Sequence, residues 1–407
     1  MIAVSPAARG SSLRPMDICM YLSYLSLKDF RNYKQLDLPL ESGLLLFQGE
    51  NAQGKTNLLE AVAMLATSNS FHASVDREVV NWDAPDRIAR VAASVKRHTG
   101  EAKIEVVIID PTPTGEAGIQ YLAPNERQRK RIKINDVPKR AIDLIGLVTV
   151  VLFSPNDLSL VDGSPEERRR FLDRGLCQMQ PHYCQALARY RKIVTQRSAL
   201  LKRIRENQED PRMLDYLDEK LTEWANMIVF ERRRMVDALN QHVDELQAII
   251  SGGREHLQIV YRPSFQVDPA LDTTEALESY RTQLREARRK EIQQGVCLLG
   301  PHRDDLEFLV NGVNMLIYGS RGQQRTAALS AKLGELAYMR AITGEEPILL
   351  LDDVFSELDV LRREYLLHQV LTHEQVLITA TDFRSFPAEM LARANRYQVI
   401  NGEIQHC

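Results

Sequence analysis

The sequence predicts an α/β protein in which the two ends of the chain build one head domain, with a mainly α-helical lobe inserted between them. A glycine-rich loop at residues 49–56 and an apolar strand ending in two aspartates at residues 347–353 have the patterns of two halves of a single site. These patterns lie near opposite ends of the chain. Residues 164–294, which separate them, are dominated by charge-rich helical patterns. The site must therefore be assembled from distant segments.

The N-terminal part of the head is predicted over residues 20–153. It follows a tail, residues 1–19, that we expect to be disordered or to come from an over-long start assignment. Alternating and apolar runs predict strands at residues 21–27, 36–40 and 44–48 and a β-rich region over 90–153. After Lys55, apolar residues recur at helical spacing, so the glycine loop stands between a strand and a helix, as a phosphate-binding loop requires.

The inserted lobe is predicted over residues 154–295, and the C-terminal part of the head over residues 296–407. Long helices are expected in the lobe between residues 164 and 251, with breaks at Pro181 and Pro211, and again at 273–294. The elements expected after residue 300 are a strand-like run at 306–316, a helix at 323–342, a strand ending at 352, a helix at 360–371 and a strand at 376–380.

Composition describes an ordinary globular chain of 407 residues, long enough for two or three domains. The formal net charge is only −3, so nucleic-acid binding would require a local basic patch or a dimer that gathers patches. The five cysteines are dispersed, without a C-x-x-C pair, at Cys19, Cys177, Cys184, Cys297 and Cys407. This usage argues against disulfides and zinc and predicts a cytoplasmic protein.

Neither a membrane span nor a secretory signal is predicted. The longest apolar stretch, residues 142–153, is interrupted by Asp143 and is too short to cross a bilayer. Residues 1–19 contain no continuous apolar segment, which a secretory signal would need.

The glycine-rich loop has the complete G-x-x-x-x-G-K-[ST] pattern of a phosphate-binding loop. Its residues, with the one that follows, are Gly49, Glu50, Asn51, Ala52, Gln53, Gly54, Lys55, Thr56 and Asn57. The two glycines permit torsions that turn successive N–H groups toward phosphates, and the helix that follows adds its positive dipole end. We expect Lys55 to contact the β- and γ-phosphates of ATP and Thr56 to bind Mg²⁺. A chance match to the pattern is the alternative.

Asp352 and Asp353 end the apolar strand at residues 347–353. At this position Asp352 is expected to hold Mg²⁺ through water, and Asp353 to orient the water that attacks the γ-phosphate. An exposed strand end followed by an acidic turn is the alternative.

Ser320, Gly322 and Gln323 stand at the start of the predicted helix 323–342. A hydroxyl, N–H groups and a helix dipole at this point suit the γ-phosphate of a nucleotide. The alternative is that Ser320 and Gln323 only form a capping box that starts the helix.

These motifs, taken in order, resemble an ABC-type ATPase head related to the heads of structural-maintenance-of-chromosomes proteins. The closer resemblance is to the RecF family of bacterial recombination and gap-repair proteins, and it covers residues 20–400. The further blocks that carry it are Phe30-Arg31-Asn32-Tyr33, Ser154-Pro155-Asn156-Asp157-Leu158, residues 163–169 (GSPEERR), residues 300–305 (GPHRDD) and residues 319–325 (GSRGQQR).

The resemblance implies a head that binds ATP as a monomer and then forms a homodimer. Two nucleotides would be sandwiched between one subunit's phosphate loop and the signature residues, Ser320, Gly322 and Gln323, of the other. Ser356 and Asp359 would form a D-loop in the same interface, unless they simply cap a helix. The family further implies recombinational gap repair, replication-fork maintenance and SOS induction, with RecR and RecO as partners.

Two departures from the general ABC pattern predict slow hydrolysis. Asp353 stands where many heads have a glutamate, and residues 379–382 stand where many have a histidine, while His373 lies at the wrong end of the strand. We expect a weak, DNA-stimulated ATPase in which ATP binding and dimerisation are the working step and hydrolysis is a reset. The glutamine of the usual Q-loop is not located.

DNA contacts are predicted from basic runs. Arg127, Arg129, Lys130 and Arg131 flank a predicted strand, and the runs at residues 168–170 and 232–234 lie on predicted helices. The alternative for each run is a solvated, salt-bridged face, favoured by nearby acidic residues such as Glu166 and Glu231.

Two other classes of protein compete with an ATP-dependent DNA-binding clamp. One is a motor or nuclease that processes DNA with an ABC-type head, although no clear nuclease cluster lies outside the head. The other is the ATPase subunit of a transporter, which the basic helices and the missing histidine disfavour.

Overall fold

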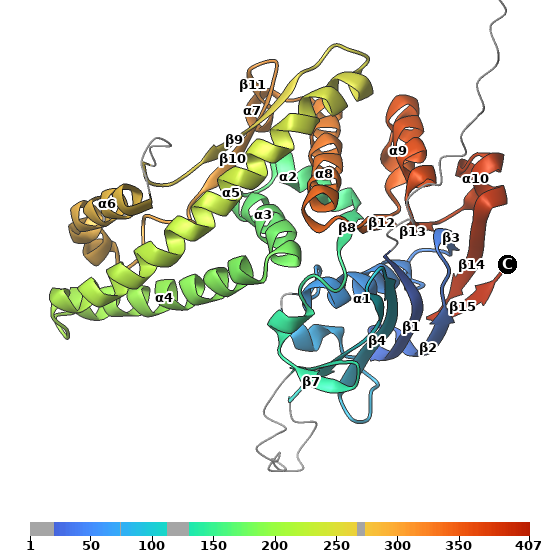
Figure 1. The fold of residues 1–407 in the computed structure, drawn as a ribbon, viewed down its shortest axis with the longest axis horizontal. Coiled ribbons are helices and arrows are strands. Elements are labelled where there is room, and N and C mark those ends of the chain that lie inside the picture. Colours follow the sequence, from blue (N-terminus) through green and yellow to red (C-terminus); the bar gives the residue numbers. More distant parts are fainter. Residues whose placement is uncertain (1–19, 74, 112–129, 267–272) are drawn as a thin grey trace, which may run out of the picture.

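The computed structural model describes residues 20–73, 75–111, 130–266 and 273–407. Both ends of the chain contribute to one head, from which a helical lobe projects to one side (Figure 1). This arrangement confirms the predicted α/β fold with a mainly helical insert. In the described parts of the chain, none of the helices combines the length and apolar character that crossing a membrane requires.

The main sheet of the head interleaves strands from the two ends of the chain. Its order is β15-β14-β3-β13-β12-β8, parallel except for the pairing of β14 with β15. The strands are β3 (Gly43–Gln48), β8 (Val150–Phe153), β12 (Ile348–Asp352), β13 (Gln375–Ala380), β14 (Ala394–Ile400) and β15 (Glu403–His406). Every residue of β12 and β13 is buried, which agrees with the mostly apolar sequences of these central parallel strands.

A second sheet, entirely antiparallel, has the order β2-β1-β4-β5-β6-β7. Its strands are β1 (Tyr21–Phe30), β2 (Tyr33–Pro39), β4 (Ile88–Arg97), β5 (Gly100–Ile109), β6 (Lys130–Ile134) and β7 (Val137–Lys139). Helix α1 (Lys55–Thr67) shares one apolar core with residues of both sheets, and ten of its residues are buried. Packing against residues of both sheets therefore fixes the position of α1, including its first turn.

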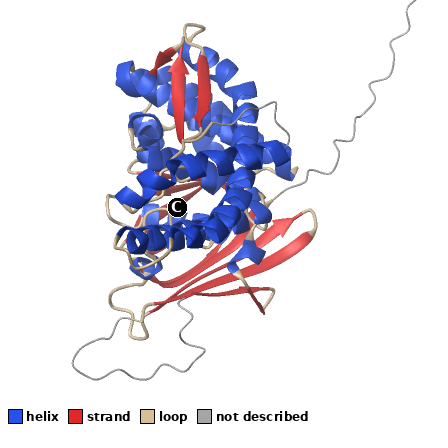
Figure 2. Ribbon diagram, turned by 90° about the vertical axis from the view of Figure 1, so that its left-hand side faces the viewer, coloured by secondary structure: helices blue, strands red, loops and turns tan. Residues whose placement is uncertain are grey.

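The inserted lobe consists mainly of helices, most of them long, and a strand of the lobe forms a small sheet with two strands of the C-terminal part (Figure 2). Its helices are α2 (Ser159–Asp162), α3 (Pro165–Met179), α4 (Pro181–Arg205), α5 (Leu214–Ser251) and α6 (Thr273–Gln294). Pro181 starts α4, where the missing N–H costs nothing, and Pro211 lies in the turn between α4 and α5. Strand β9 (Leu257–Arg262) pairs with β10 (Asp305–Val310), which links the two sides of the expected boundary at residue 295.

The predicted strand-like run at residues 306–316 is wrong in its second half. Asn311 and Gly312 have φ values of 50° and 79°, so the chain turns there and returns as the short strand β11 (Val313–Asn314). The Asn314 side chain then accepts a hydrogen bond from Leu316 N and caps helix α7 (Met315–Tyr318).

Three further helices complete the C-terminal part of the head. They are α8 (Arg321–Thr343), α9 (Val360–Thr372) and α10 (Ala388–Arg393). Leu329 and Leu333 of α8 share a core with Leu349 of β12 and Ile250 near the end of α5. The lobe is thus packed on the same helix that carries the predicted signature residues at its start.

Candidate nucleotide-binding site

The glycine-rich loop connects β3 to α1 and has backbone torsions that favour glycine. Gly54 has a φ of 111°, and a Cβ atom there would lie only 2.5 Å from Nδ2 of Asn32. Ala52 also lies in the left-handed region, with a φ of 65°. The loop is therefore held in one tight conformation against the β1–β2 hairpin.

Lys55 lies folded against its own loop. Its Nζ donates hydrogen bonds to the carbonyl oxygens of Gly49 (2.6 Å) and Glu50 (2.7 Å), and the residue is buried. Burial lowers the pKa of Lys55, while the charges of Asp353 and Asp352 act in the opposite direction. The positive charge of Lys55 is therefore already positioned to attract an anionic ligand at this loop.

Thr56 and Asp352 meet beside Lys55. The Thr56 hydroxyl lies 2.9 Å from Oδ2 of Asp352, and the Thr379 hydroxyl donates to Oδ1 at 2.7 Å. Asp352 is only 8% exposed, so these hydroxyls fix its carboxylate in place. A hydroxyl beside a carboxylate is an oxygen ligand set of the kind that Mg²⁺ prefers, so these residues fit that ion.

Asp353 follows β12 in the left-handed conformation, with a φ of 50°. Its N–H donates to the carbonyl oxygen of Thr379 at 3.2 Å. A cavity of about 280 Å³ opens here, and its lining residues are Asn51, Ala52, Gly54, Lys55, Thr56, Asn57, Pro155, Asp352 and Asp353. The structure thus brings the predicted loop residues and both aspartates to one cavity.

The β1–β2 hairpin braces the loop from outside the cavity. Asn32 donates from Nδ2 to the carbonyl oxygen of Gln53 (2.9 Å) and accepts from Nδ2 of Asn57 (2.8 Å). Tyr33 donates from its hydroxyl to the carbonyl oxygen of Gly54 at 2.9 Å. The family block at residues 30–33 therefore acts on the loop directly, a role the sequence pattern alone did not assign.

The C-terminal hairpin holds the loop from another side. Asn401 N donates to Oε1 of Gln53 (2.6 Å), and Gly402 N donates to the carbonyl oxygen of Gln53 (3.0 Å). At the start of the loop, a Cβ on Gly49 would lie 2.4 Å from the carbonyl oxygen of Val399. No motif in the sequence marks these contacts, because they join segments far apart in the chain and mostly involve backbone atoms.

Ser320 caps the N-terminus of α8 with the expected capping box. Its Oγ accepts from Gln323 N (3.3 Å), and Gln323 Oε1 accepts from Ser320 N (3.1 Å). Ser320 is exposed, while Gly322 and Gln323 are half-buried. None of the three is among the described residues that line the cavity at the phosphate loop of the same chain.

Arg362 joins the signature helix to the predicted D-loop. Its guanidinium donates to the carbonyl oxygen of Gly322 (2.9 Å) and to the hydroxyl of Thr326 (2.8 Å), and it also pairs with Asp359. Asp359 in turn accepts from Arg362 N at 3.0 Å and caps α9. Ser356 donates to the carbonyl oxygen of Asp353 at 2.8 Å, so the predicted D-loop is also anchored to the end of β12.

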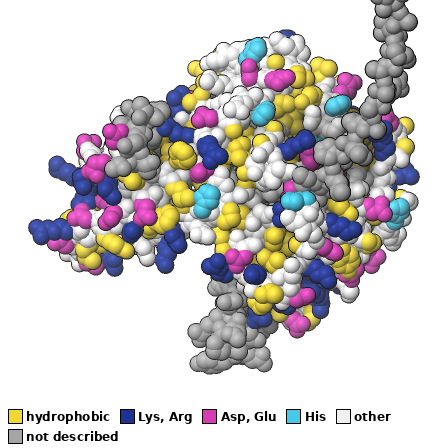
Figure 3. Space-filling view, viewed as in Figure 1, with side chains coloured by type: hydrophobic (Ala, Val, Ile, Leu, Met, Phe, Trp, Pro, Cys, Tyr) yellow, Lys and Arg dark blue, Asp and Glu magenta, His cyan; other side chains and the backbone are white. Residues whose placement is uncertain are grey.

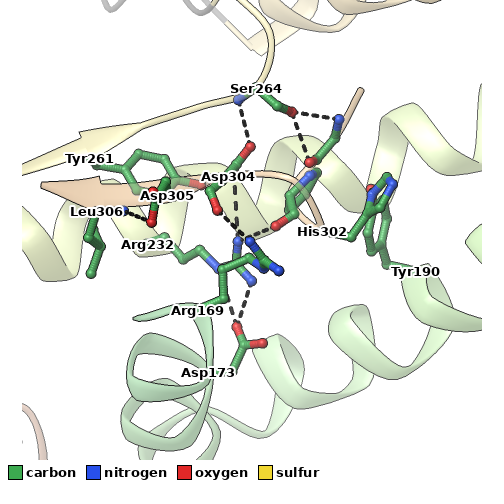
Figure 4. A network of polar contacts seen from close by, with 12 residues as sticks. Arg169, Asp173, Tyr190, Arg232, Tyr261, Ser264, His302, Asp304, Asp305 and Leu306 are labelled. Carbon is green, nitrogen blue, oxygen red and sulfur yellow. Dashed lines mark hydrogen bonds and ion pairs between the residues drawn. The ribbon is translucent and has the colours of Figure 1, made fainter. Parts of the chain in front are cut away.

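Two of the predicted DNA-contacting runs each have an arginine buried in the lobe. Figure 4 shows one of them, Arg232, in a polar network with Arg169 of the other run. Arg168 and Arg232 are each 2% exposed. Arg168 pairs with Asp305 at 2.6 Å, and Arg232 pairs with Asp173 at 2.8 Å. These two guanidinium groups are occupied by carboxylates inside the lobe, whereas Arg170 and Arg234 of the same runs are exposed. DNA contact by the two runs remains a prediction.

The basic run around β6 is only partly described, because Arg127 and Arg129 lie outside the described residues. Lys130 forms an ion pair with Asp76 (2.9 Å) and hydrogen-bonds Ser68 and Asn69. Arg131 is exposed on β6. DNA contact by this run remains a prediction.

The parallel sheet, the phosphate loop at the end of β3 and the aspartate at the end of β12 together define a nucleotide-binding head of the ABC ATPase class. The model of the RecF/RecN/SMC N-terminal domain family matches residues 21–402. The chain belongs to this family and, within it, to the RecF proteins.

Relatives of known name cover nearly the whole chain. The DNA replication and repair protein RecF of Chloroflexus aurantiacus is 45% identical over 95% of this chain and 99% of its own length. The RecF protein of Halalkalibacterium halodurans is 39% identical over 95% of this chain. A solved structure described as the recombination mediator RecF with ATP in the RecFOR pathway has a TM-score of 0.83 and 32% identity, covering 96% of this chain.

More distant structures show the fold alone. The Smc head domain of Pyrococcus furiosus, with an extended coiled coil, has a TM-score of 0.51 and 14% identity.

Proposed function

We propose that the protein is an ATP-dependent DNA-binding switch of DNA replication and recombinational gap repair. The observation that carries the proposal is the cavity in which Thr56 and Asp352, from opposite ends of the chain, share a hydrogen bond beside Lys55. The RecF relatives, which match along almost their entire length, supply the DNA-repair context.

The residues at the cavity fit ATP with Mg²⁺. On nucleotide binding, Lys55 would exchange its bonds to the carbonyl oxygens of Gly49 and Glu50 for the β- and γ-phosphates. Thr56 and Asp352 would hold Mg²⁺, which neutralises phosphate charge when bound. The solved RecF structures described as ATP-bound support this assignment.

ATP binding would cause two copies of the head to dimerise. Ser320 is exposed and lies apart from the cavity of its own chain, which supports a role toward the nucleotide of a second copy. Arg362 bonds both Gly322 at the start of the signature helix and Asp359 of the predicted D-loop. We propose that this bridge would link the binding of a partner head to the segment that follows Asp353.

Hydrolysis would be slow and would reset the switch. Asp353 has a shorter side chain than the glutamate of many ABC heads, so it would hold the attacking water less closely. Next to it, Thr379 takes part in fixing Asp352 by a hydrogen bond of 2.7 Å. We expect a weak ATPase that DNA stimulates.

The proposed partners are DNA, a second copy of the chain, and the RecR and RecO proteins. The description of a RecF relative as a mediator in the RecFOR pathway supports the last two. We also propose roles in replication-fork maintenance and SOS induction, which the resemblance to the RecF family implies.

Fluorescence anisotropy of a labelled gapped duplex tests the proposal, with wild type and Lys55→Met compared with and without ATP and Mg²⁺. ATP should increase the affinity of wild type for DNA and leave Lys55→Met unchanged. Equal ATP enhancement in both proteins would contradict the proposal. The same samples are run on a denaturing gel, where cleaved strands would instead favour the DNA-processing alternative.

A further inference from the structure

Helix α4 (Pro181–Arg205) has an unusual charge composition, with seven basic residues and no Asp or Glu in its 25 residues. The basic residues are Arg189, Arg191, Lys192, Arg197, Lys202, Arg203 and Arg205. In other helices, acidic residues one turn away can pair with such charges and stabilise the helix. In α4 this balance is impossible within the helix itself.

Six of these side chains are exposed, and two of the six have close acidic partners: Arg191 pairs with Asp173 at 3.0 Å, and Arg205 lies 4.0 Å from Glu206. We call the other four, Arg189, Lys192, Lys202 and Arg203, the α4 basic face. The opposite side of the helix is buried, as Tyr190 and Leu201 show with exposures of 1% and 0%. Figure 3 shows Lys and Arg side chains over this part of the lobe, alongside acidic residues.

On the neighbouring helices α3 and α6, basic side chains are paired with acidic residues of the same helix. On α3, Arg170 pairs with Glu166 (2.6 Å) and Glu167 (2.9 Å). On α6, Arg281 and Arg285 both lie near Glu278, at 3.4 and 3.5 Å. These helices have the salt-bridged surfaces that ordinary solvation explains.

Within the ranges that the structure describes, one ion pair involves a member of the α4 basic face. It joins Arg203 to Glu209 at 3.9 Å, between two side chains that are 53% and 29% exposed. Among the described residues, neither Lys192 nor Lys202 lies within 4.0 Å of a carboxylate oxygen. Their positive potential is therefore directed mainly to solvent, where it attracts polyanions.

Arg189 is also held in position. Its guanidinium carbon lies 4.7 Å from the ring centroid of Trp224 on α5, in a cation–π contact. A stacked guanidinium keeps its N–H edge available for an anion, and the contact reduces the entropy lost when that anion binds.

The geometry of the face fits the backbone of duplex DNA. Arg189 and Arg203 are separated by about 21 Å along the helix axis, a length over which one DNA strand presents several phosphates. Single-stranded DNA is normally bound with aromatic side chains on which bases stack. The tyrosines of α4, Tyr183 and Tyr190, are buried and offer no such platform.

We propose that the α4 basic face binds the phosphate backbone of duplex DNA without reading its sequence. This proposal rests on the proposed ATP-dependent DNA binding and assigns that binding to a site in the lobe. It adds a contact surface that the run at residues 127–131 does not include.

The test compares two triple variants with the same change in charge. Arg189→Gln/Lys192→Gln/Lys202→Gln removes three charges from the α4 basic face. The control, Lys220→Gln/Arg281→Gln/Arg285→Gln, removes three charges that are paired with Glu223 or Glu278. Duplex and single-stranded DNA affinities are measured by anisotropy with ATP over a range of salt concentrations, and melting temperatures verify that each variant is folded.

The α4 variant should bind duplex DNA at least about tenfold more weakly, and the slope of log K against log salt should fall by about 3. The control should keep both values. An unchanged affinity and slope in a folded α4 variant would overturn the proposal, as would a loss confined to single-stranded DNA. If wild type itself shows no ATP-dependent DNA binding, the proposed function fails instead.

Discussion

Thr56 and Asp352 share a hydrogen bond of 2.9 Å although 296 sequence positions separate them. The contact forms because β3 and β12 both pair with β13, which places the phosphate loop and the aspartate at the same edge of the sheet. The pair therefore requires that β3 and β12 lie in the same sheet. In the sequence, the helical lobe lies between β3 and β12, so the polypeptide chain connects it to both halves of this site.

Asp352→Asn should separate metal binding from folding. The amide preserves the volume and can still hydrogen-bond Thr56 and Thr379, so the unfolding midpoint should change little. Loss of the charge should weaken ATP binding in Mg²⁺ by at least about tenfold and have little effect in EDTA. Titration with a fluorescent ATP analogue measures both. Asp353→Asn is the control and should retain binding while losing turnover; equal binding by wild type and Asp352→Asn in Mg²⁺ would refute the assignment.

Asn32→Ala should loosen the phosphate loop from outside the cavity. The substitution removes the bonds to Gln53 and Asn57 and should cost about 1–3 kcal/mol of unfolding free energy, with a parallel loss of ATP affinity. Urea unfolding and ATP titration measure the two effects. Asn395→Ala, which loses only an exposed bond to Glu41, should leave both unchanged. An Asn32→Ala protein with full ATP affinity would show that the brace is dispensable.

Gly322→Ala should affect self-association rather than folding. The nearest atom to an added Cβ is Nη2 of Arg362 at 3.7 Å, an ordinary contact, so the melting temperature should be maintained or slightly raised. If a second head approaches the backbone here, the added methyl group should reduce ATP-dependent dimers while leaving ATP binding by the monomer intact. Light scattering with ATP checks this outcome. Undiminished dimers would mean that no close approach occurs at Gly322.

His302 should make stability depend on pH. Burial lowers its pKa from 6.5 to about 4, with nearby arginines acting in the same direction, while its bond to the Cys297 carbonyl oxygen opposes the shift. Because the folded-state pKa is depressed, the contribution to stability is complete above pH 6.5 and is lost as the pH falls toward 4. Between pH 7 and 5, wild type should lose about 2 kcal/mol more than His302→Gln.

Urea unfolding at pH 7 and pH 5 measures this difference. The variant also loses the 2.6 Å contact with the Tyr190 hydroxyl, so it should be less stable at both values, and only the difference between them reports on titration. Parallel losses in the two proteins would exclude His302 as the titrating group.

The sequence predicted those parts of the site that depend on local pattern. The loop at residues 49–56, with its flanking strand and helix, needs only neighbouring residues to be recognised, and the structure has the predicted order. The braces from Asn32, Val399 and Asn401 were not predicted, because they depend on contacts between segments that no local pattern connects.

Charge patterns were the least informative part of the sequence. A run such as residues 168–170 mixes a buried arginine, Arg168, with an exposed one, Arg170, because a helix turns successive side chains to different sides. The prediction of one strand over residues 306–316 was also wrong, because it did not include the turn at Asn311-Gly312. Apolar residues lie on both sides of this turn, so the pattern of apolar residues does not reveal it. Whether a charged side chain is buried or exposed depends on the fold, and a local charge pattern does not reveal it.

Sedimentation velocity of wild type and Ser320→Arg, each with saturating ATP and Mg²⁺, tests most directly whether two heads share their nucleotides. We predict that wild type sediments as a dimer, whereas Ser320→Arg binds ATP normally and sediments as a monomer. Dimers of the same stability in both proteins, or a wild-type protein that stays monomeric with ATP even on gapped duplex DNA, would contradict the account.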